Sequence, residues 1–169
     1  MMEHSCCFTG HRSFSMTEDV LSARLKQTIA LMVEGGVTTF FAGGAQGFDL
    51  LAEEAVLAEK EKHPELKLIL CLPFPGHTKN WPVEEQLRQD AVSNQADELS
   101  YVGRHYFRGC MHIRNRQMVE RSRFCVCLLE RATGGTASTI AYARKKGRFV
   151  LNLADQAMLP RSFIHGEEP

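Results

Sequence analysis

Three glycine-rich turns contain the groups in this sequence that are best suited to chemistry. They are Thr9-Gly10-His11-Arg12, Gly43-Gly44-Ala45-Gln46-Gly47 and Thr133-Gly134-Gly135-Thr136. Each turn follows an apolar run and precedes an amphipathic run, which predicts a connection from a strand to a helix. N–H groups at a helix start have no acceptor within the helix and lie at the positive end of its dipole. The turns therefore predict a site for phosphate or another anion.

Polar side chains in and beside these turns complete the predicted site. Arg12 is suited to clamping an anion through paired hydrogen bonds, and His11 is suited to carrying a proton near neutral pH. Asp49 and Glu53 are four residues apart, so they share one helix face and could contact ribose or act as acid or base. Structural roles stay open for all four: dipole compensation for the carboxylates, loop packing for His11 and a free surface position for Arg12. The predicted catalytic residues are Asp49, Glu53 and His11, and the predicted ligand-binding residues are Gly10, Arg12, Gly43, Gly44, Gln46, Gly47, Arg114, Asn115, Gly134, Gly135, Thr136 and Ser138.

The turn at residues 43–49 differs from the two best-known nucleotide motifs. It lacks the GxGxxG spacing of dinucleotide-binding folds and the GK[ST] ending of a P-loop. Standard NAD binding and ATP hydrolysis are therefore not favoured, and no cofactor is expected. His112 and Cys110 are too close in sequence to share one helical face, so no metal site is expected either.

The apolar periodicity predicts an α/β protein in which strands and helices alternate. A pair formed by Ser15 and Glu18 resembles a capping box and predicts the first helix start. Strands are predicted at residues 5–9, 37–42, 66–72, 99–102, 124–129 and 149–153, and helices after Ser15, after Gly47, and at 83–96, 108–121 and 137–146. Parallel strands need crossover helices, which cover both faces of the sheet. The prediction is a Rossmann-like three-layer sandwich with a mainly parallel sheet of about six strands, whose ligand site lies at the carboxyl ends of the strands.

Composition favours one compact domain over residues 1–169, with a core at about 4–153 and a loose tail after Leu159. The 169 residues are 44% hydrophobic, with 20 basic and 20 acidic side chains. A zero net charge argues against nucleic acid as the main partner. No membrane-spanning run or secretory signal is evident, so a cytoplasmic protein is expected. The spacing of the six cysteines fits core packing better than disulfides or zinc.

The sequence resembles the SLOG superfamily, which includes the Smf/DprA proteins and the lonely-guy (LOG) phosphoribohydrolases. Within it, the chain is most similar to the small YpsA-like proteins over residues 4–153. The features that carry the resemblance are the Thr9-Gly10 turn, residues 43–49, Pro73-Phe74, Trp81 and Arg114-Asn115. The resemblance implies a Rossmann-like domain that binds or senses a nucleotide or a nucleotide-derived ligand.

LOG enzymes cleave an N-glycosidic bond, and their motifs are similar to two segments here. Residues 111–118 resemble MHxRKxxM, with Arg114 on the functional arginine and Asn115 in place of lysine. Residues 134–141 resemble GGxGTxxE, but Ala141 occupies the place of the catalytic glutamate. An enzyme of this kind therefore needs another carboxylate, from Asp49, Glu53 or Glu130.

An N-glycosidic hydrolase is the alternative function, and whether the protein is an enzyme stays open. The third and less favoured alternative is single-stranded DNA binding by scattered basic side chains, which include Arg104 and Arg108. The resemblance also leads us to expect self-association.

Overall fold

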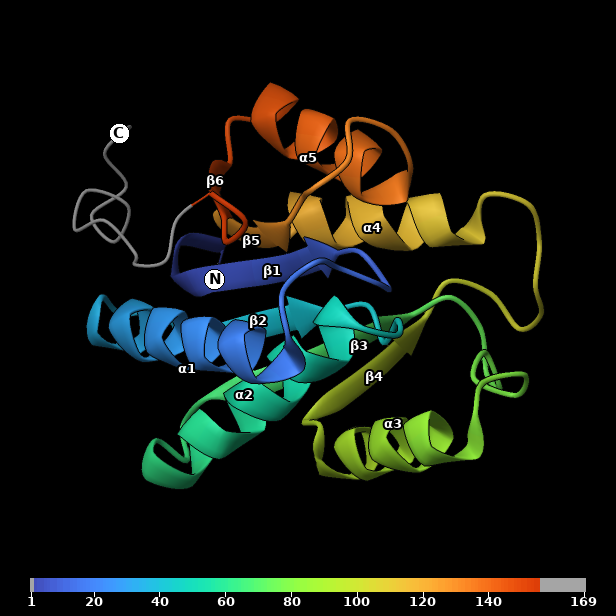
Figure 1. Cartoon of the computed structure of the whole chain (residues 1–169), viewed down its shortest axis with the longest axis horizontal. Helices are drawn as coiled ribbons and strands as arrows, with labels where there is room; N and C mark the ends of the chain where they lie inside the picture. The colour runs from blue at the N-terminus through green and yellow to red at the C-terminus, as the bar shows by residue number, and fades with distance from the viewer. Residues whose placement is uncertain (1, 156–169) are drawn as a thin grey trace.

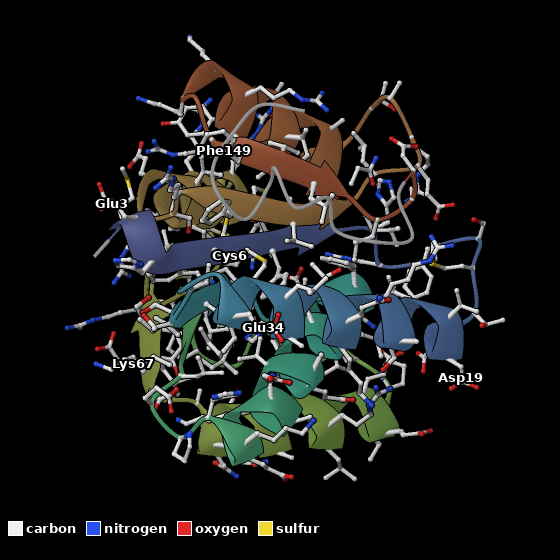
Figure 2. All side chains as sticks on the ribbon, turned by 90° about the vertical axis from the view of Figure 1, so that its left-hand side faces the viewer. Glu3, Cys6, Asp19, Glu34, Lys67 and Phe149 are labelled. Carbon is white, nitrogen blue, oxygen red and sulfur yellow. The ribbon has the colours of Figure 1, made fainter. Side chains whose placement is uncertain are left out.

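The computed structural model of the protein describes residues 2–155. Six strands form one sheet: β1 (Ser5–Gly10), β2 (Thr39–Ala42), β3 (Lys67–Leu72), β4 (Glu98–Tyr101), β5 (Phe124–Leu128) and β6 (Phe149–Asn152). Their order is β4-β3-β2-β1-β5-β6, and every neighbouring pair is parallel. The order can be followed in Figure 2 from Phe149 on β6, past Cys6 on β1, to Lys67 on β3. The predicted Rossmann-like α/β fold is confirmed.

Five α-helices cover the two faces of the sheet. They are α1 (Glu18–Glu34), α2 (Phe48–Lys62), α3 (Val83–Gln95), α4 (Cys110–Glu120) and α5 (Gly135–Lys145), and a short 3-10 helix, Met2–His4, precedes β1. The chain builds outward from β1 to β4 with α1, α2 and α3 as connections, then returns through α4 to β5, beside β1. Right-handed crossovers place helices of the return path on the opposite face. Figure 1 shows α4 and α5 on one side of β1 and the other three helices on the other side.

Two apolar cores fix these layers. Phe8 and Phe40 on neighbouring strands stack at 5.9 Å between ring centroids and pack with Leu25 and Phe48 on the face of α1 and α2. On the other face, Met118 of α4 and Ile140 of α5 pack against alternate strand residues such as Cys7 and Phe41. All six cysteines are buried and free, in agreement with their predicted packing role.

The start of α1 differs from the prediction. The helix begins at Glu18 and is capped by Thr17, whose hydroxyl accepts a hydrogen bond from the N–H of Val20 at 3.3 Å. Ser15 instead donates through both its N–H and its hydroxyl to Glu130, which follows β5. The predicted capping box was wrong because Ser15 has a partner in a distant turn. The predicted tail after Leu159 lies outside the described residues. Among the helices of residues 2–155, none is long and apolar enough to cross a membrane.

Candidate functional site

A cavity of about 470 Å³ opens at the carboxyl ends of β1 and β5. The chain reverses direction across the sheet at these neighbouring strands, which is where open α/β sheets bind ligands. The lining comes from four parts of the chain: the turn after β1, the start of α2, the first turns of α4, and the turn after β5. These residues are Thr9, Gly10, His11, Arg12, Ser13, Ala45, Asp49, Met111, Arg114, Asn115, Arg131, Thr133, Gly134, Gly135 and Thr136.

The start of α5 supplies the hydrogen-bond donors of this cavity. Gly134 is the N-cap at φ 104°, and no side chain caps the helix. The N–H of Ser138 bonds to the carbonyl of Gly134 at 3.1 Å, whereas the preceding amides of Gly135, Thr136 and Ala137 have no acceptor among the described residues. Unpaired N–H groups at a helix start are ready donors to an anion.

Two exposed arginines flank these amides. Arg12 follows β1 and Arg131 follows β5, and both line the cavity. Within residues 2–155 neither guanidinium forms an ion pair. Both are therefore available to a ligand, and together with the α5 amides they make one side of the cavity electropositive.

Arg114 is buried and supports the β2–α2 turn as well as lining the cavity. Its Nη1 donates to the carbonyl of Gly43, and its Nε donates to Asn115 Oδ1 at 2.7 Å. A Cβ on Gly43 would lie 2.9 Å from Arg114 Nη1, so the guanidinium needs glycine there. Burial lowers the pKa of Arg114, and the charge of Asp49 opposes this effect. The guanidinium is held in place before any ligand arrives.

Two carboxyl groups on one face of α2 lie behind this turn. Asp49 Oδ2 accepts from the Ala45 N–H at 3.3 Å, and Glu53 Oε1 accepts from the Gly44 N–H at 2.9 Å. Burial raises the pKa of Asp49 to about 6, although the charge of Arg114 and backbone hydrogen bonds act to lower this pKa. Burial and the charge of Asp49 raise the pKa of Glu53 well above its usual range, which favours the neutral form of its carboxyl. Only Asp49 of the two lines the cavity.

His11 lines the cavity, but its ring is already committed to the fold. Its Nε2 accepts the N–H of Glu130 at 2.9 Å, and its own carbonyl accepts the N–H of Phe48 at 3.2 Å. Burial, followed by the charge of Arg131, lowers the pKa of His11 and so favours the neutral imidazole. His11 therefore joins the turns after β1 and β5, and its Nε2 is not free to donate a proton.

The other predicted ligand residues fall into two groups. Gly10, Asn115, Gly134, Gly135 and Thr136 line the cavity, whereas Gly43, Gly44, Gln46, Gly47 and Ser138 do not. The three glycines of the second group leave room for neighbouring atoms. At Gly47, for example, the φ is 76° and an added Cβ would lie 2.2 Å from the carbonyl oxygen of Arg12. Sequence reasoning missed Arg131 and Ser13; the position of Arg131 between the end of β5 and the Gly134 turn was the available signal.

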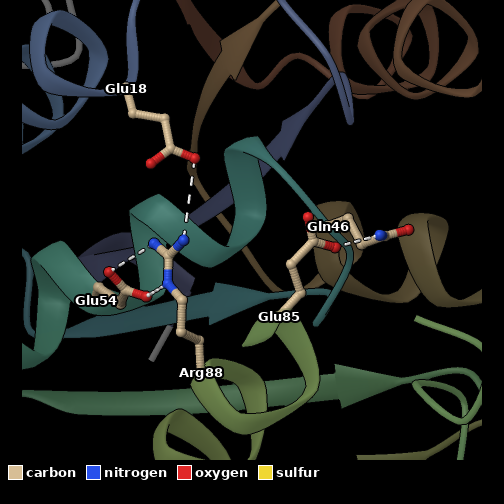
Figure 3. A network of polar contacts seen from close by, with 5 residues as sticks. All are labelled: Glu18, Gln46, Glu54, Glu85 and Arg88. Atoms are coloured by element: carbon tan, nitrogen blue, oxygen red, sulfur yellow. Dashed lines mark hydrogen bonds and ion pairs between the residues drawn. The ribbon is translucent and has the colours of Figure 1, made fainter. Parts of the chain in front are cut away.

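A network outside the cavity holds the β2–α2 turn and α3 in place. Gln46 donates to Glu85, so its side chain contacts α3 (Figure 3). Arg88 donates from Nε and Nη2 to the two oxygens of Glu54 at 2.8 and 3.1 Å, and its Nη1 lies 3.9 Å from Glu18. These contacts connect α3 with α2 and α1.

Fold and cavity together define a Rossmann-like α/β protein with a cavity at the switch point of its sheet, lined by backbone amides and arginines. The chain belongs to the YspA SLOG family, whose model (YpsA) matches residues 6–158. This confirms the resemblance to the SLOG superfamily and to YpsA-like proteins.

Two curated relatives are each less than 30% identical to this chain. The uncharacterized SPbeta prophage-derived protein YoqJ of Bacillus subtilis is 27% identical over 139 residues, covering 72% of this chain and 81% of that protein. The UPF0398 protein SSP1297 of Staphylococcus saprophyticus is 29% identical over 114 residues, covering 59% of this chain and 61% of that protein. The alignment thus reaches about three fifths of the staphylococcal relative.

Two solved structures share the fold. DNA processing protein A (DprA) from Streptococcus pneumoniae has a TM-score of 0.63 at 17% identity, covering 88% of this chain and 49% of that chain. DprA from Helicobacter pylori has a TM-score of 0.60 at 17% identity, covering 88% of this chain and 64% of that chain. The Helicobacter structure is described as giving insight into a single-stranded DNA binding mode.

The prediction that nucleic acid is an unlikely partner is contradicted by this structural comparison. A protein of the same fold, DprA from Helicobacter pylori, is described by its binding of single-stranded DNA. The prediction depended on a net charge of zero for the whole chain. Net charge is a sum and is insensitive to a local cluster of basic side chains, so it was the wrong quantity for this question.

Proposed function

We propose that the cavity binds the phosphate and ribose of a nucleotide or nucleotide-derived ligand. The observation that carries the proposal is the row of amides at Gly135, Thr136 and Ala137, which have no acceptor among the described residues. Gly135 and Thr136 line the same cavity as Arg12 and Arg131, whose guanidiniums form no ion pair within residues 2–155. Amides at a helix start and an arginine fork both match phosphate oxygens. A volume of about 470 Å³ also accommodates a small organic ligand.

Asp49 gives the lining of the cavity a second chemistry. Its buried carboxyl belongs to α2, and one of its oxygens, Oδ1, has no hydrogen-bond partner among the described residues. A carboxylate in the same cavity as a phosphate site is suited to ribose hydroxyls, which donate hydrogen bonds that a second phosphate cannot supply. The ligand class that fits both the amides and the carboxyl is a sugar phosphate, with or without its base.

The test is a thermal-shift panel with sulfate, ribose 5-phosphate, nucleoside mono- and diphosphates and ADP-ribose. A ligand at about one hundred times its Kd stabilises the folded state by about 2.7 kcal/mol, which is readily seen as a rise in Tm. Arg131→Ala is expected to remove most of the shift, and Lys145→Ala, which removes an exposed charge at the far end of α5, is the matched control. No shift with any compound at millimolar concentration would refute the proposal.

A second variant tests the same cavity by filling it. Gly135 has no atom within 4 Å of an added Cβ, and it lines the cavity. Gly135→Leu is therefore expected to fold normally while its side chain occupies the place of the ligand. Loss of the ligand shift in Gly135→Leu with an unchanged Tm of the free protein would support the assignment, and an unchanged shift would count against it.

Hydrolysis of an N-glycosidic bond is the second candidate, and the position of Asp49 favours it. Ala141 is not part of the cavity lining, Glu53 is fully buried behind the cavity, and Glu130 is held by Ser15. Asp49 is thus the one carboxyl among the described lining residues. In this reaction the bond from C1′ to the base breaks, water oxygen bonds to C1′, and the base leaves with a proton. Chromatography for free base decides the question, and base release that persists in Asp49→Asn would exclude this residue.

A further inference from the structure

The β4–α4 loop, residues 102–109, carries a combination of side chains that the cavity does not use. Tyr106 is 67% exposed and Phe107 is 40% exposed, although both are aromatic. Arg104 and Arg108 flank them and are exposed. Exposed aromatic rings between cations are unusual on a protein that needs no partner there, since large apolar groups are normally covered. This segment is called the aromatic loop below.

The aromatic loop is held in place by the neighbouring strand. The N–H groups of Val102 and Gly103 donate to the carbonyls of Leu72 and Pro73 at 3.0 and 3.1 Å. Tyr106 contacts Phe74 edge to face, with ring centroids 6.0 Å apart. The Phe107 ring lies over Gly103, where an added Cβ would come within 2.9 Å of Cε1. Both rings are therefore positioned in advance, which lowers the entropy lost when a ligand stacks on them.

The charged side chains along the loop and the first turns of α4 are all basic. Residues 99–119 contain four arginines, at 104, 108, 114 and 116, and no aspartate or glutamate. Within the part of the chain that the structure describes, Arg104 and Arg108 form no ion pair. Two copies of such a surface repel each other, which disfavours self-association, whereas a polyanion is attracted.

The loop leads directly into the proposed phosphate site. It ends where α4 begins at Cys110, and Met111 and Arg114 of the first turns of α4 line the cavity. At a rise of about 1.5 Å per residue, Arg114 lies only about 6 Å along the helix from Cys110. Figure 1 shows the β4–α4 loop at the same end of the sheet as the β3–α3 loop and the start of α4. One extended ligand can therefore reach the cavity and the rings.

We propose that the aromatic loop stacks unpaired bases of a single-stranded nucleic acid whose phosphate or terminal nucleotide occupies the cavity. Tyr106 and Phe107 supply faces for the bases, and Arg104 and Arg108 contact the flanking phosphates. Stacking on protein aromatics tolerates any base, because every base has a π face, so the surface recognises the absence of pairing rather than a sequence. This inference rests on the proposed function of the cavity and extends it to a longer ligand.

The test measures fluorescence anisotropy with labelled twelve-nucleotide oligothymidine and oligouridine, beside the thermal shift with mononucleotides. Tyr106→Ala/Phe107→Ala is expected to weaken oligonucleotide binding at least about tenfold, since each stacked base contributes about 1–3 kcal/mol. The same variant is expected to keep the mononucleotide shift. The matched control is Val83→Ala/Leu87→Ala, which truncates two exposed apolar side chains on α3, 71% and 64% exposed. The two oligomers distinguish DNA from RNA as the tighter ligand.

A charge variant provides an independent readout. Arg104→Gln/Arg108→Gln is expected to lower the slope of log affinity against log salt concentration by roughly 1.4, about 0.7 for each lost phosphate contact. A merely structural role of the loop would lower affinity without this change in slope.

The outcomes separate the two proposals. Oligonucleotide binding that is insensitive to the ring variant, or absent while mononucleotides still shift the Tm, would overturn the inference and leave the function of the cavity standing. Absence of both signals would remove both. Concentration-dependent dimerisation of the wild type that the ring variant abolishes would show that the rings cover each other between copies, which also overturns the inference.

Discussion

Replacing Asp49 by asparagine is expected to stabilise the protein at neutral pH. Asp49 is 4% exposed, and its Oδ1 has no hydrogen-bond partner within residues 2–155. Burial raises the pKa of this carboxyl from 3.8 to about 6, even though Arg114 and the turn amides favour the charged form. At pH values between 3.8 and about 6, the folded state therefore holds a proton that the unfolded state releases. Ionisation of Asp49 costs stability in the folded protein, and asparagine cannot ionise.

The size of the effect follows from the pKa difference. A rise of the Asp49 pKa from 3.8 to about 6 corresponds to a free-energy difference of about 3 kcal/mol between the protonated and ionised forms of the folded protein. Below the unfolded pKa of 3.8 Asp49 is protonated in both states, and the charge has no effect on stability. As the pH rises from 3.8 to the folded value of about 6, the unfolded chain ionises more readily than the folded protein, and the wild type loses stability until both states are ionised. Asp49→Asn is therefore expected to be about 3 kcal/mol more stable at about pH 7.5, about half of that at pH 5, and equal near pH 3.5.

Urea denaturation at these three pH values measures the difference directly. Asp90→Asn, which removes an exposed carboxyl from α3, is the control and is expected to change stability by less than about 0.5 kcal/mol. An Asp49→Asn protein that is less stable than the wild type at about pH 7.5 would mean that the pair with Arg114 outweighs burial. A stability difference that does not change with pH would show that Asp49 does not titrate in this range.

Further predictions concern the glycines, the network at α3 and ligand binding. Gly10→Ala is expected to lower the free energy of unfolding by about 1–3 kcal/mol in chemical denaturation, because the added Cβ would lie 2.3 Å from Phe48 Cγ. Gly135→Ala, whose Cβ meets no atom within 4 Å, is expected to leave the free energy of unfolding unchanged or to raise it slightly. Arg88→Ala is expected to cost no more than about 1 kcal/mol in the same assay, since its ion pairs with Glu54 and Glu18 are partly exposed. Sulfate, whose charge is constant in this range, is expected to bind more tightly below a pH of about 6 as Asp49 gains a proton, and calorimetry of Asp49→Asn should show no such dependence.

Most of the fold was predictable because hydrophobic periodicity records burial. The predicted strands at 66–72 and 124–129 differ by one residue from β3 and β5, and the predicted helix at 83–96 ends one residue after α3. Parallel pairing followed from the continuous apolar strands. The first helix start was predicted wrongly because a capping box is a local pattern, and the partner of Ser15, Glu130, is 115 residues away. No local signal reports such a contact.

The site was predictable in its place but only partly in the roles of its residues. Turns after parallel strands meet at one edge, so the gathering of the first and third glycine turns around one cavity followed from the fold. The purpose of each glycine did not follow. Gly43 makes room for Arg114 and Gly47 makes room for the main chain at Arg12, so these glycines serve packing, although a ligand-binding turn would contain the same residues. Sequence alone does not distinguish space for a ligand from space for a neighbouring residue.

Asp49 and Glu53 show the same ambiguity, and their burial separates their roles. Glu53 is fully buried and accepts the N–H of Gly44, so it is explained by the turn that it supports. Asp49 supports the same turn through a longer bond to Ala45, yet it lines the cavity and lowers the stability of the fold when ionised. A group that makes the folded protein less stable is typical of a binding or catalytic site rather than of a scaffold. If Asp49→Asn stabilises the protein and also strengthens sulfate binding, the carboxylate is of no use for folding or for the anion. Its use would then be contact with the part of the ligand beyond the phosphate, where hydroxyl donors are expected.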